Sequence, residues 1–247
     1  MAVAENRSTN RSLLTSRVDR YIHFDRANRP YLEWQIEGFL PHIGDRVLEV
    51  GCGVGSIIRL LGNREFICGI DVDPEVLDYA ATRFPDRHRY KFRVLDFSAL
   101  SKSEIISLRE MRFDTMVSLN VLEHINDDVA AVRAMREIVR PGGHLALLVP
   151  AHPALYGEYD RVDGHFRRYT RGTFANLLQA AGFTNYSLRY FNAVGALGWW
   201  VRYKVFRQSI HGSGDFRLMN AAIPILRPLE RIIPPPFGLS VAAVVTS

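Results

Sequence analysis

The chain has 247 residues, of which 47% are hydrophobic and 23% are charged, so its length and composition suit one α/β domain with insertions or at most two small domains. The formal net charge of +5 is too small to single out an anionic metabolite, a membrane surface or RNA as the partner. The chain has only two cysteines, no apolar run of a signal peptide and no stretch of about 18 apolar residues, so we expect a cytoplasmic protein without a disulfide framework or a membrane span.

The N-terminal half is predicted to place a polar segment before a regular alternation of strands and helices. Residues 1–29 are expected to form a flexible or capping segment, and a first helix is predicted over 30–40 because proline suits the first helical position. Runs typical of buried strands then alternate with amphipathic helices as far as Pro150. The predicted strands cover residues 46–50, 66–70, 90–95, 113–119 and 144–149. This alternation predicts a doubly wound α/β fold around a parallel sheet.

After Pro150 the alternation stops. Residues 151–170 are predicted to be a loop-like insertion, after which Thr170 begins a helix and residues 183–191 form a strand. Two amphipathic helices, split around residues 212–214, are predicted within 193–233. The predicted division is a core of residues 30–192 that contains the insertion, a helical lid over 193–237 and a final core strand within 238–247. That last strand is expected to pair beside the strand at 183–191.

A glycine turn follows the first predicted strand. Gly51, Gly53 and Gly55 allow the backbone to approach a ligand at the carboxyl end of the sheet, with a helix predicted over 56–61. The dinucleotide fingerprint G-x-G-x-x-G would require glycine at Ser56, which weakens a nicotinamide interpretation. Glu49 lies two residues before the turn, where an acid can face the positive amino group of a bound amino-acid moiety.

Two further acids end the next two strands. Asp71 ends the second strand, where a carboxylate can accept hydrogen bonds from both ribose hydroxyls, whereas Asp73 is better placed to cap the following helix. Asp96 ends the third strand and can accept the exocyclic amine of adenine, with Phe97 beside it; an Asx turn is the alternative role of Asp96.

Residues 30–150 resemble, in order and spacing, the class I S-adenosylmethionine-dependent methyltransferases that act on small molecules. The matching stretches are Val47–Gly55, Gly69–Ala80, Asp96–Phe97, Phe113–Ile125 and Arg140–Gly143. The resemblance implies a Rossmann-like sheet of seven strands, mostly parallel with an antiparallel last strand, and S-adenosylmethionine as the cofactor. It implies a cofactor site formed by Glu49, Gly51, Cys52, Gly53, Gly55, Asp71, Val72, Asp96, Phe97 and Asn120.

The stretch from Asn120 to His124 bears on metal binding. Relatives that methylate quinone-precursor phenols carry an additional acid here and bind a divalent metal with a Glu-His pair. In this chain Asn120 stands where that acid would lie, so we expect no metal and a structural role for Glu123 and His124. A metal bound by His152, His165 and neighbouring acids is an alternative whose spacing is not diagnostic.

The same region argues against nucleic acid as the substrate. It lacks the Asp/Asn-Pro-Pro-aromatic motif of amino-directed nucleic-acid methyltransferases. Cys52 and Cys68 lie on the wrong strands to serve as the nucleophile that methylation of cytosine C5 requires. A small-molecule partner is therefore expected.

The acceptor is expected to meet the insertion, the lid and the N-terminal region. His152 and His165 are candidate general bases, because the pKa of histidine lies near working pH. Arg167 and Arg168 could clamp a carboxylate or phosphate, or could pair with nearby acids. The remaining candidate substrate residues are aromatic and comprise Tyr21, Tyr31, Tyr156, Tyr169, Trp199 and Trp200. Residues 193–210 could also contact a membrane peripherally.

The sequence predicts methyl transfer from S-adenosylmethionine to an apolar or carboxylated metabolite, with oxygen as the favoured acceptor atom. C- or N-methylation of a natural-product or lipid-like molecule is the alternative within enzymes. An NAD-binding protein and a non-catalytic module of the same fold are the alternatives from other classes, and RNA methylation would require a continuous basic face.

Overall fold

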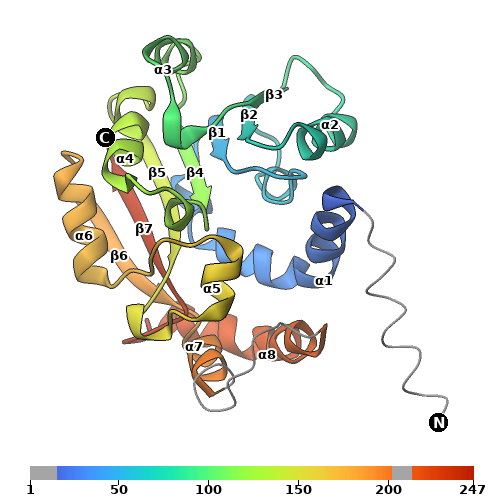
Figure 1. Ribbon diagram of the computed structural model, residues 1–247, viewed down its shortest axis with the longest axis vertical. Coiled ribbons are helices and arrows are strands. Elements are labelled where there is room, and N and C mark those ends of the chain that lie inside the picture. Colours follow the sequence, from blue (N-terminus) through green and yellow to red (C-terminus); the bar gives the residue numbers. More distant parts are fainter. Residues whose placement is uncertain (1–15, 202–212) are drawn as a thin grey trace.

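The computed structural model describes residues 16–201 and 213–247, which build one seven-stranded sheet with helices on both faces (Figure 1). The strands lie in the order β3-β2-β1-β4-β5-β7-β6. Their bounds are Arg46–Val50 for β1, Phe66–Asp71 for β2, Tyr90–Val94 for β3, Thr115–Leu119 for β4, His144–Pro150 for β5, Asn185–Phe191 for β6 and Ser240–Thr246 for β7. Only β7 is antiparallel to its neighbours in this sheet, and it lies between β5 and β6. The predicted sheet and its antiparallel last strand are therefore confirmed.

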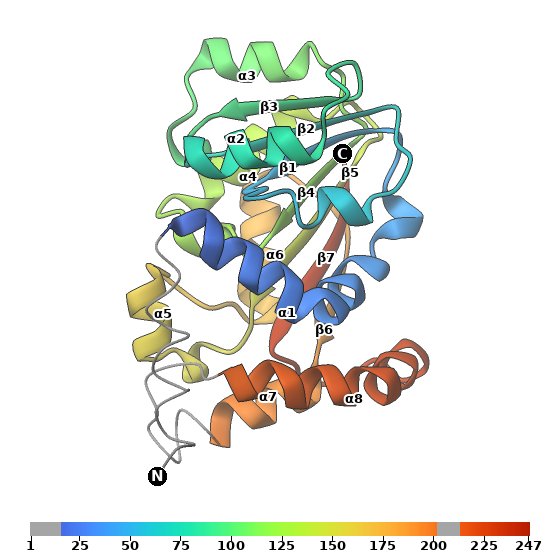
Figure 2. The same cartoon turned by 90° about the vertical axis from the view of Figure 1, so that its right-hand side faces the viewer.

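Helices cover the two faces of the sheet unequally. One face carries α3 (Lys102–Arg109), α4 (Asp128–Ile138) and α6 (Arg171–Ala180), whose apolar stripes join the larger part of the core. The other face carries α1 (Arg17–Glu37), α2 (Pro74–Arg83) and α8 (Ser213–Ile232), and α1 packs directly against α8. Figure 2 shows α1 crossing below the carboxyl ends of the central strands, above α7 (Ala193–Trp200) and α8.

Helix α1 begins much earlier than the sequence predicts. Ser16 caps it in a capping box with Asp19, and Pro30 lies inside the helix rather than at its first position. The prediction failed because the weakly amphipathic first half of α1 resembles a polar tail, while proline at a helix start is the commoner arrangement. Residues 16–29 therefore belong to the ordered fold, whereas residues 1–15 lie outside the described part.

Two other local predictions need correction. Residues 56–61 do not form an α-helix but a turn with a short 3-10 segment at Ile58–Leu60. The insertion at 151–170 is not all loop, because it contains a 3-10 turn at Pro153–Leu155 and the helix α5 at Glu158–Asp163. The helix capped by Thr170 is confirmed as α6, and the predicted pairing of the last strand with β6 is confirmed.

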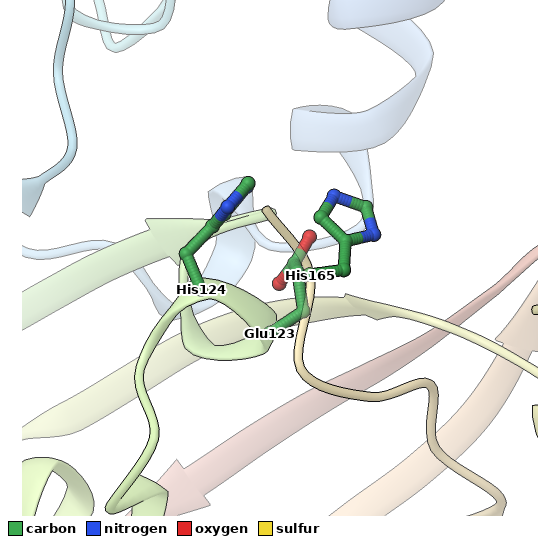
Figure 3. A group of neighbouring side chains, drawn as sticks. All are labelled: Glu123, His124 and His165. Carbon is green, nitrogen blue, oxygen red and sulfur yellow. The ribbon is translucent and has the colours of Figure 1, made fainter. Parts of the chain in front are cut away.

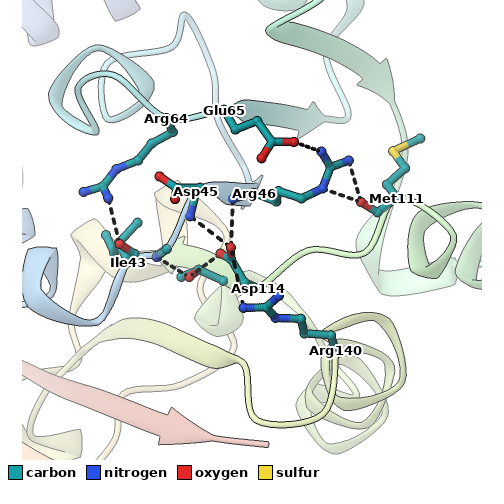
Figure 4. Close-up of polar contacts among 10 residues, drawn as sticks. Ile43, Asp45, Arg46, Arg64, Glu65, Met111, Asp114 and Arg140 are labelled. Atoms are coloured by element: carbon teal, nitrogen blue, oxygen red, sulfur yellow. Dashed lines mark hydrogen bonds and ion pairs between the residues drawn. The ribbon is translucent and has the colours of Figure 1, made fainter.

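A polar network joins the amino ends of the central strands, at the edge of the sheet opposite to the glycine turn (Figure 4). The buried carboxylate of Asp114 accepts hydrogen bonds from the backbone N–H groups of Asp45 and Arg46, at 2.9 and 3.0 Å. Arg46 in turn donates to Glu65 and to the backbone oxygen of Met111. These bonds fix β1 beside β4, so the strand ends that form the site have a fixed register.

No helix in the described residues is long and apolar enough to cross a membrane. Helix α7 exposes Leu197 and Trp200 to solvent, and Val201 directly after it is also exposed. The rest of the segment for which membrane contact is predicted, residues 202–210, lies outside the described residues, so that contact stays a prediction.

Candidate active site

The glycine turn is built so that only glycine can occupy its key positions. Gly51 and Gly53 have φ values of +73° and +49°, which disfavour any side chain. A Cβ on Gly51 would lie 2.5 Å from the Val121 side chain, and one on Gly53 would lie 3.3 Å from the ring of Tyr21. The backbone N–H groups of Gly51 and Cys52 both donate to the oxygen of Ile70, at 2.9 and 3.0 Å, which holds the turn against β2.

Glu49 presents a carboxylate to this turn that the protein itself does not satisfy. Its side chain is buried at the end of β1, and its Oε2 has no hydrogen-bond partner among the described residues. Burial, and then the nearby charge of Asp71, raise the pKa of Glu49 well above its usual value. A cationic group of a ligand would lower this pKa again and supply the missing partner, so the turn fits a cofactor that ends in an amino group.

Asp71 holds the turn from the neighbouring strand. Its Oδ2 accepts a hydrogen bond from the Gly53 N–H at 2.8 Å, and its Oδ1 accepts one from the Asp73 N–H at 3.1 Å. Asp73 caps α2 by accepting from the Glu75 N–H, as the sequence predicts. Because Asp73 serves as the cap, Asp71 remains in place for the predicted ribose contact.

The predicted adenine contacts lie at the end of β3. Asp96 caps the 3-10 turn at Phe97–Ala99 by accepting hydrogen bonds from the N–H and hydroxyl of Ser98, at 2.9 and 2.6 Å. The alternative role of Asp96 in an Asx turn is therefore present, and an adenine contact would have to use its remaining lone pairs. Phe97 is buried and Val72 is exposed. The assignments of these residues to the cofactor stay predictions.

One cavity of about 1320 Å³ runs from the glycine turn to α7 and α8. Ten of the predicted site residues line it, namely Tyr21, Tyr31, Glu49, Gly51, Cys52, Gly53, Asn120, His165, Arg168 and Trp199. Ten do not, namely Gly55, Asp71, Val72, Asp96, Phe97, His152, Tyr156, Arg167, Tyr169 and Trp200. The cofactor turn and much of the predicted acceptor wall thus share one space.

Helix α1 contributes more of this wall than the sequence indicates. Tyr21 lies over Gly53, and Arg17 pairs with Asp73 at 2.9 Å, so the first turns of α1 lie across the cofactor turn. Asn28 is buried in the same wall, and its Oδ1 has no partner among the described residues. The signal that could have revealed this role is the Ser16–Asp19 capping box, which marks the true start of the helix.

A buried charge network organises the insertion around Asp160. Its carboxylate accepts hydrogen bonds from the Arg168 Nε–H at 2.8 Å and the Gly157 N–H at 2.9 Å, and it lies 2.9 Å from Nδ1 of His165. Arg168 also lies over the ring of Trp199, 4.6 Å from its centroid. Arg168 is therefore a structural ion-pair partner that also reaches the cavity.

His165 is held as an imidazolium rather than as a free base. Its Nδ1 faces Asp160, and its Nε2 lies 3.1 Å from a carboxylate oxygen of Asp163. Burial lowers the pKa of His165, but the hydrogen bonds to the two acids outweigh it and raise the pKa to about 9. Both ring nitrogens therefore carry protons at neutral pH, and neither is available to accept one from a substrate.

Beside His165 lies an acid for which the sequence predicts a structural role. Glu123 lies in the 3-10 turn Leu122–His124 after β4, and it is fully buried in the cavity wall. Neither carboxylate oxygen has a hydrogen-bond partner among the described residues, and burial raises the pKa of Glu123 to about 7. Figure 3 shows the carboxylate between the rings of His124 and His165.

Ligand atoms of Glu123, His124 and His165 lie within 4.8 Å of one another, a spacing that a metal ion could bridge. However, a metal would have to displace Asp160 or Asp163 from a nitrogen of His165 and remove its proton. The third possible metal ligand beside Glu123 and His124 is thus His165, rather than the residue at position 120. The expectation that no metal binds stays a prediction.

Four other predicted residues of the insertion have structural contacts. His152 has a φ of +59° and stacks on Tyr190 outside the cavity wall, so its position gives no support to a role as a base. Arg167 pairs with Asp128 at 2.8 Å, and the Tyr169 hydroxyl donates to the same carboxylate. The remaining residue is Tyr156, whose hydroxyl donates to the backbone oxygen of His165. Outside the insertion, Trp200 is half exposed on α7.

Comparisons with known proteins agree with this geometry. A family model described as "Methyltransferase domain" matches residues 9–188. The ubiquinone biosynthesis O-methyltransferase of Ralstonia nicotianae is 30% identical over 115 residues, which cover 46% of each chain. The 27-O-demethylrifamycin SV methyltransferase of Amycolatopsis mediterranei is 31% identical over 137 residues, which cover 52% of this chain and 48% of the relative. The chain spans about half the length of the curated relatives it matches.

The fold also matches solved structures. The S-adenosylmethionine-dependent methyltransferase of Mesorhizobium loti superposes with a TM-score of 0.60, covering 90% of this chain and 98% of that one. The sequence identity is 18%, so the likeness extends to the fold alone.

Proposed function

The chain belongs to the class I S-adenosylmethionine-dependent methyltransferases, and on this premise we propose that it methylates a hydroxyl oxygen of a small apolar or carboxylated metabolite. The observation that carries the proposal is the single cavity that joins the glycine turn to the insertion and to α7. The names of the two relatives above, each a small-molecule methyltransferase, support an acceptor of this class.

The residues that would hold the cofactor follow from the strand ends. Glu49 and the backbone of Gly51 and Gly53 would bind the amino-acid end, Asp71 would bind the ribose, and Asp96 would bind the adenine. The bound cofactor supplies a methyl group on a positively charged sulfur, which makes that carbon electrophilic. The protein's own contribution is to exclude water and to align the acceptor, because an in-line displacement is sensitive to geometry.

The wall beyond the turn supports an acceptor with an apolar body. Leu32, Val194, Trp199 and Met219 line this part of the cavity, and they would cover an aromatic or aliphatic group. Arg168 reaches the same wall, although Asp160 already balances much of its charge. A carboxylate on the acceptor would therefore find a cation here, while the apolar walls favour molecules larger than a simple sugar.

The test combines a labelled methyl donor with a complex mixture of acceptors. The full chain is incubated with methyl-labelled S-adenosylmethionine and a metabolite extract, and labelled products are identified by mass spectrometry and their site of methylation by NMR. We expect an O-methyl product. A label on nitrogen or carbon would refute the oxygen assignment, and tight NAD binding without binding of S-adenosylmethionine would refute the enzyme class.

A matched pair of variants tests the cofactor site in the same assay. Glu49→Gln should weaken binding of S-adenosylhomocysteine by about 10-fold or more, because a charged hydrogen bond to the amino group is lost. Glu75→Gln, an exposed change on α2, should leave the affinity unchanged. Equal affinities of the two variants, measured by calorimetry, would contradict the role of Glu49.

A further inference from the structure

We propose that Glu123 is the catalytic base of this site, which takes the proton from an acceptor hydroxyl as that oxygen is methylated. The inference rests on the proposed function, because it requires a hydroxyl acceptor in the cavity. A structural role is predicted for Glu123 from the sequence, and His152 and His165 are the bases predicted there; in this proposal Glu123 takes their place.

The first support is the unsatisfied carboxylate itself. Glu123 is fully buried, and both of its oxygens lack partners among the described residues, although buried polar atoms are nearly always hydrogen-bonded. Glu123 is among the residues that line the cavity, next to His124 and His165. An ionised carboxylate only accepts hydrogen bonds, and the matching ligand group is therefore a donor such as a hydroxyl.

The second support is the way in which the carboxylate is held. The backbone oxygen of Glu123 accepts a hydrogen bond from the Phe166 N–H at 2.7 Å. This bond joins the turn after β4 to the insertion. The backbone of Glu123 is thus held in place, while its carboxylate oxygens make no hydrogen bond within the described residues.

The third support is the charge around Glu123. The groups that face it are His124 from its own turn, Asp163 from α5, and His165 and Arg168 from the segment that follows α5. Behind them, Asp160 pairs with both cations. Burial and then the charge of His165 lower the pKa of His124, which leaves that ring neutral.

The cluster is therefore one negative charge in excess when Glu123 is ionised, with three carboxylates against the cations of His165 and Arg168. Uptake of one proton by Glu123 makes the cluster neutral. Burial raises its pKa to about 7, close to the value at which a general base is most effective.

The oxygen of the acceptor hydroxyl forms a bond to the methyl carbon while the bond from that carbon to sulfur breaks, and the electron pair of the broken bond stays on sulfur. The proton of the hydroxyl moves to a carboxylate oxygen of Glu123, which later releases it to water. His165 and Asp160 are positioning residues in this step, because they hold the charge around the base and take no proton from the acceptor.

The first arm of the test needs no acceptor. Infrared spectra of the full chain are recorded as the pH is raised from 6 to 8, for the wild type, Glu123→Gln and the control Glu137→Gln, an exposed change on α4. We expect the wild type and the control to show a carboxyl that loses its proton in this range and is missing from the spectra of Glu123→Gln. Identical difference spectra for all three proteins would overturn the proposal.

The second arm measures turnover on the O-methylated acceptor identified by the labelling experiment. Glu123→Gln should lower kcat by roughly 100- to 10,000-fold, with KM and the affinity for S-adenosylhomocysteine nearly unchanged. If the variant does not fold, the pH dependence of kcat for the wild type serves as the test. The wild-type kcat should rise with pH to a plateau, with a midpoint near pH 7. A rate independent of pH from 5.5 to 8, or full turnover by Glu123→Gln, would overturn the proposal.

Three outcomes distinguish the role of Glu123 from the alternatives. If the wild type labels no hydroxyl at all, the proposed function fails, whereas labelling of a hydroxyl at the full rate by Glu123→Gln defeats only the role of Glu123. If added Zn²⁺ or Mn²⁺ binds the wild type but not Glu123→Gln, and turnover requires that metal, the carboxylate is a metal ligand and the proposal is overturned.

Discussion

Replacement of Asp160 by asparagine should strongly destabilise the protein, although the two side chains have nearly the same shape. The carboxylate has no exposed surface and accepts hydrogen bonds from Arg168 and the Gly157 N–H, and it faces Nδ1 of His165. Asparagine would leave two buried cations without an anion between them. Breaking a buried ion pair by removing one partner costs about 3–5 kcal/mol. In a chain of this size each kcal/mol lowers Tm by about 2–4 °C, so the expected loss is roughly 6–20 °C.

Thermal unfolding followed by circular dichroism at pH 7 measures this effect. Asp163→Asn is the matched control, because Asp163 contacts the same imidazole at 3.1 Å but its side chain is 51% exposed. A solvent-exposed pair contributes at most about 1 kcal/mol, so the control should lose only about 1–4 °C. The interpretation of Asp160 as the centre of the network is refuted if Asp160→Asn lowers Tm no more than Asp163→Asn does.

The difference in Tm between the wild type and Asp160→Asn should depend on pH, and the pKa of His165 determines the direction of that dependence. Its pKa in the folded protein, about 9, lies above its unfolded value of 6.5, so its stabilising contribution is complete below pH 6.5 and is lost as the pH rises through 9. The shift corresponds to about 3 kcal/mol, which screening at the half-exposed Asp163 reduces to about 2 kcal/mol. The difference in Tm between wild type and Asp160→Asn should therefore narrow between pH 6.5 and 9, and a constant difference would contradict this linkage.

Further predictions concern the cofactor turn and the insertion. Asp71→Ala should weaken binding of S-adenosylhomocysteine by roughly 10- to 100-fold in calorimetry, because it removes both the acceptor of the Gly53 N–H and the proposed ribose contact; an unchanged affinity would exclude the ribose contact. Gly53→Ala and Gly62→Ala should each lower the free energy of unfolding by about 1–2 kcal/mol, because alanine disfavours the positive φ of both positions. Only Gly53→Ala should also weaken cofactor binding, because Gly53 belongs to the glycine turn, whereas nothing lies within 4 Å of a Cβ at Gly62. Tyr169→Phe should cost about 1–2 kcal/mol in thermal unfolding through the lost bond to Asp128, while turnover per folded molecule stays unchanged; a selective rise in KM would restore Tyr169 to the acceptor site.

The fold could be predicted from the sequence because its signals are local. Each strand at the centre of the sheet is a short apolar run, and capping residues such as Asp73 and Thr170 mark where helices begin. The glycine turn was also recognisable, since its residues are adjacent along the chain. Helix α1 was the largest exception, because Pro30 lies in its interior and the true cap, Ser16, precedes a polar stretch with little amphipathic pattern.

The acceptor side could be predicted only in part, because its key contacts join residues that are distant along the chain. His165 looked like a base as an isolated histidine, and only the fold shows that Asp160 and Asp163 occupy both of its ring nitrogens. A structural role was predicted for Glu123 because the Glu-His pair lacks the additional acid that completes the metal site of its relatives. Its burial and its unsatisfied oxygens are tertiary properties that no spacing of residues reveals.

The position of this charge cluster follows from how β5 ends. A parallel bridge between Ala151 and Tyr169 returns the chain to its starting point, so the intervening residues form a closed excursion over the carboxyl ends of β4 and β5. The excursion carries Asp160 and His165 to the turn that bears Glu123, while the strand register stays intact. Cofactor binding and acceptor chemistry therefore depend on separate parts of the chain. Changes within the excursion should alter the proton transfer and the choice of acceptor while leaving the affinity for S-adenosylmethionine nearly constant, because the hydrogen bonds that hold the glycine turn come from β2 and from Arg83 of α2, outside the excursion.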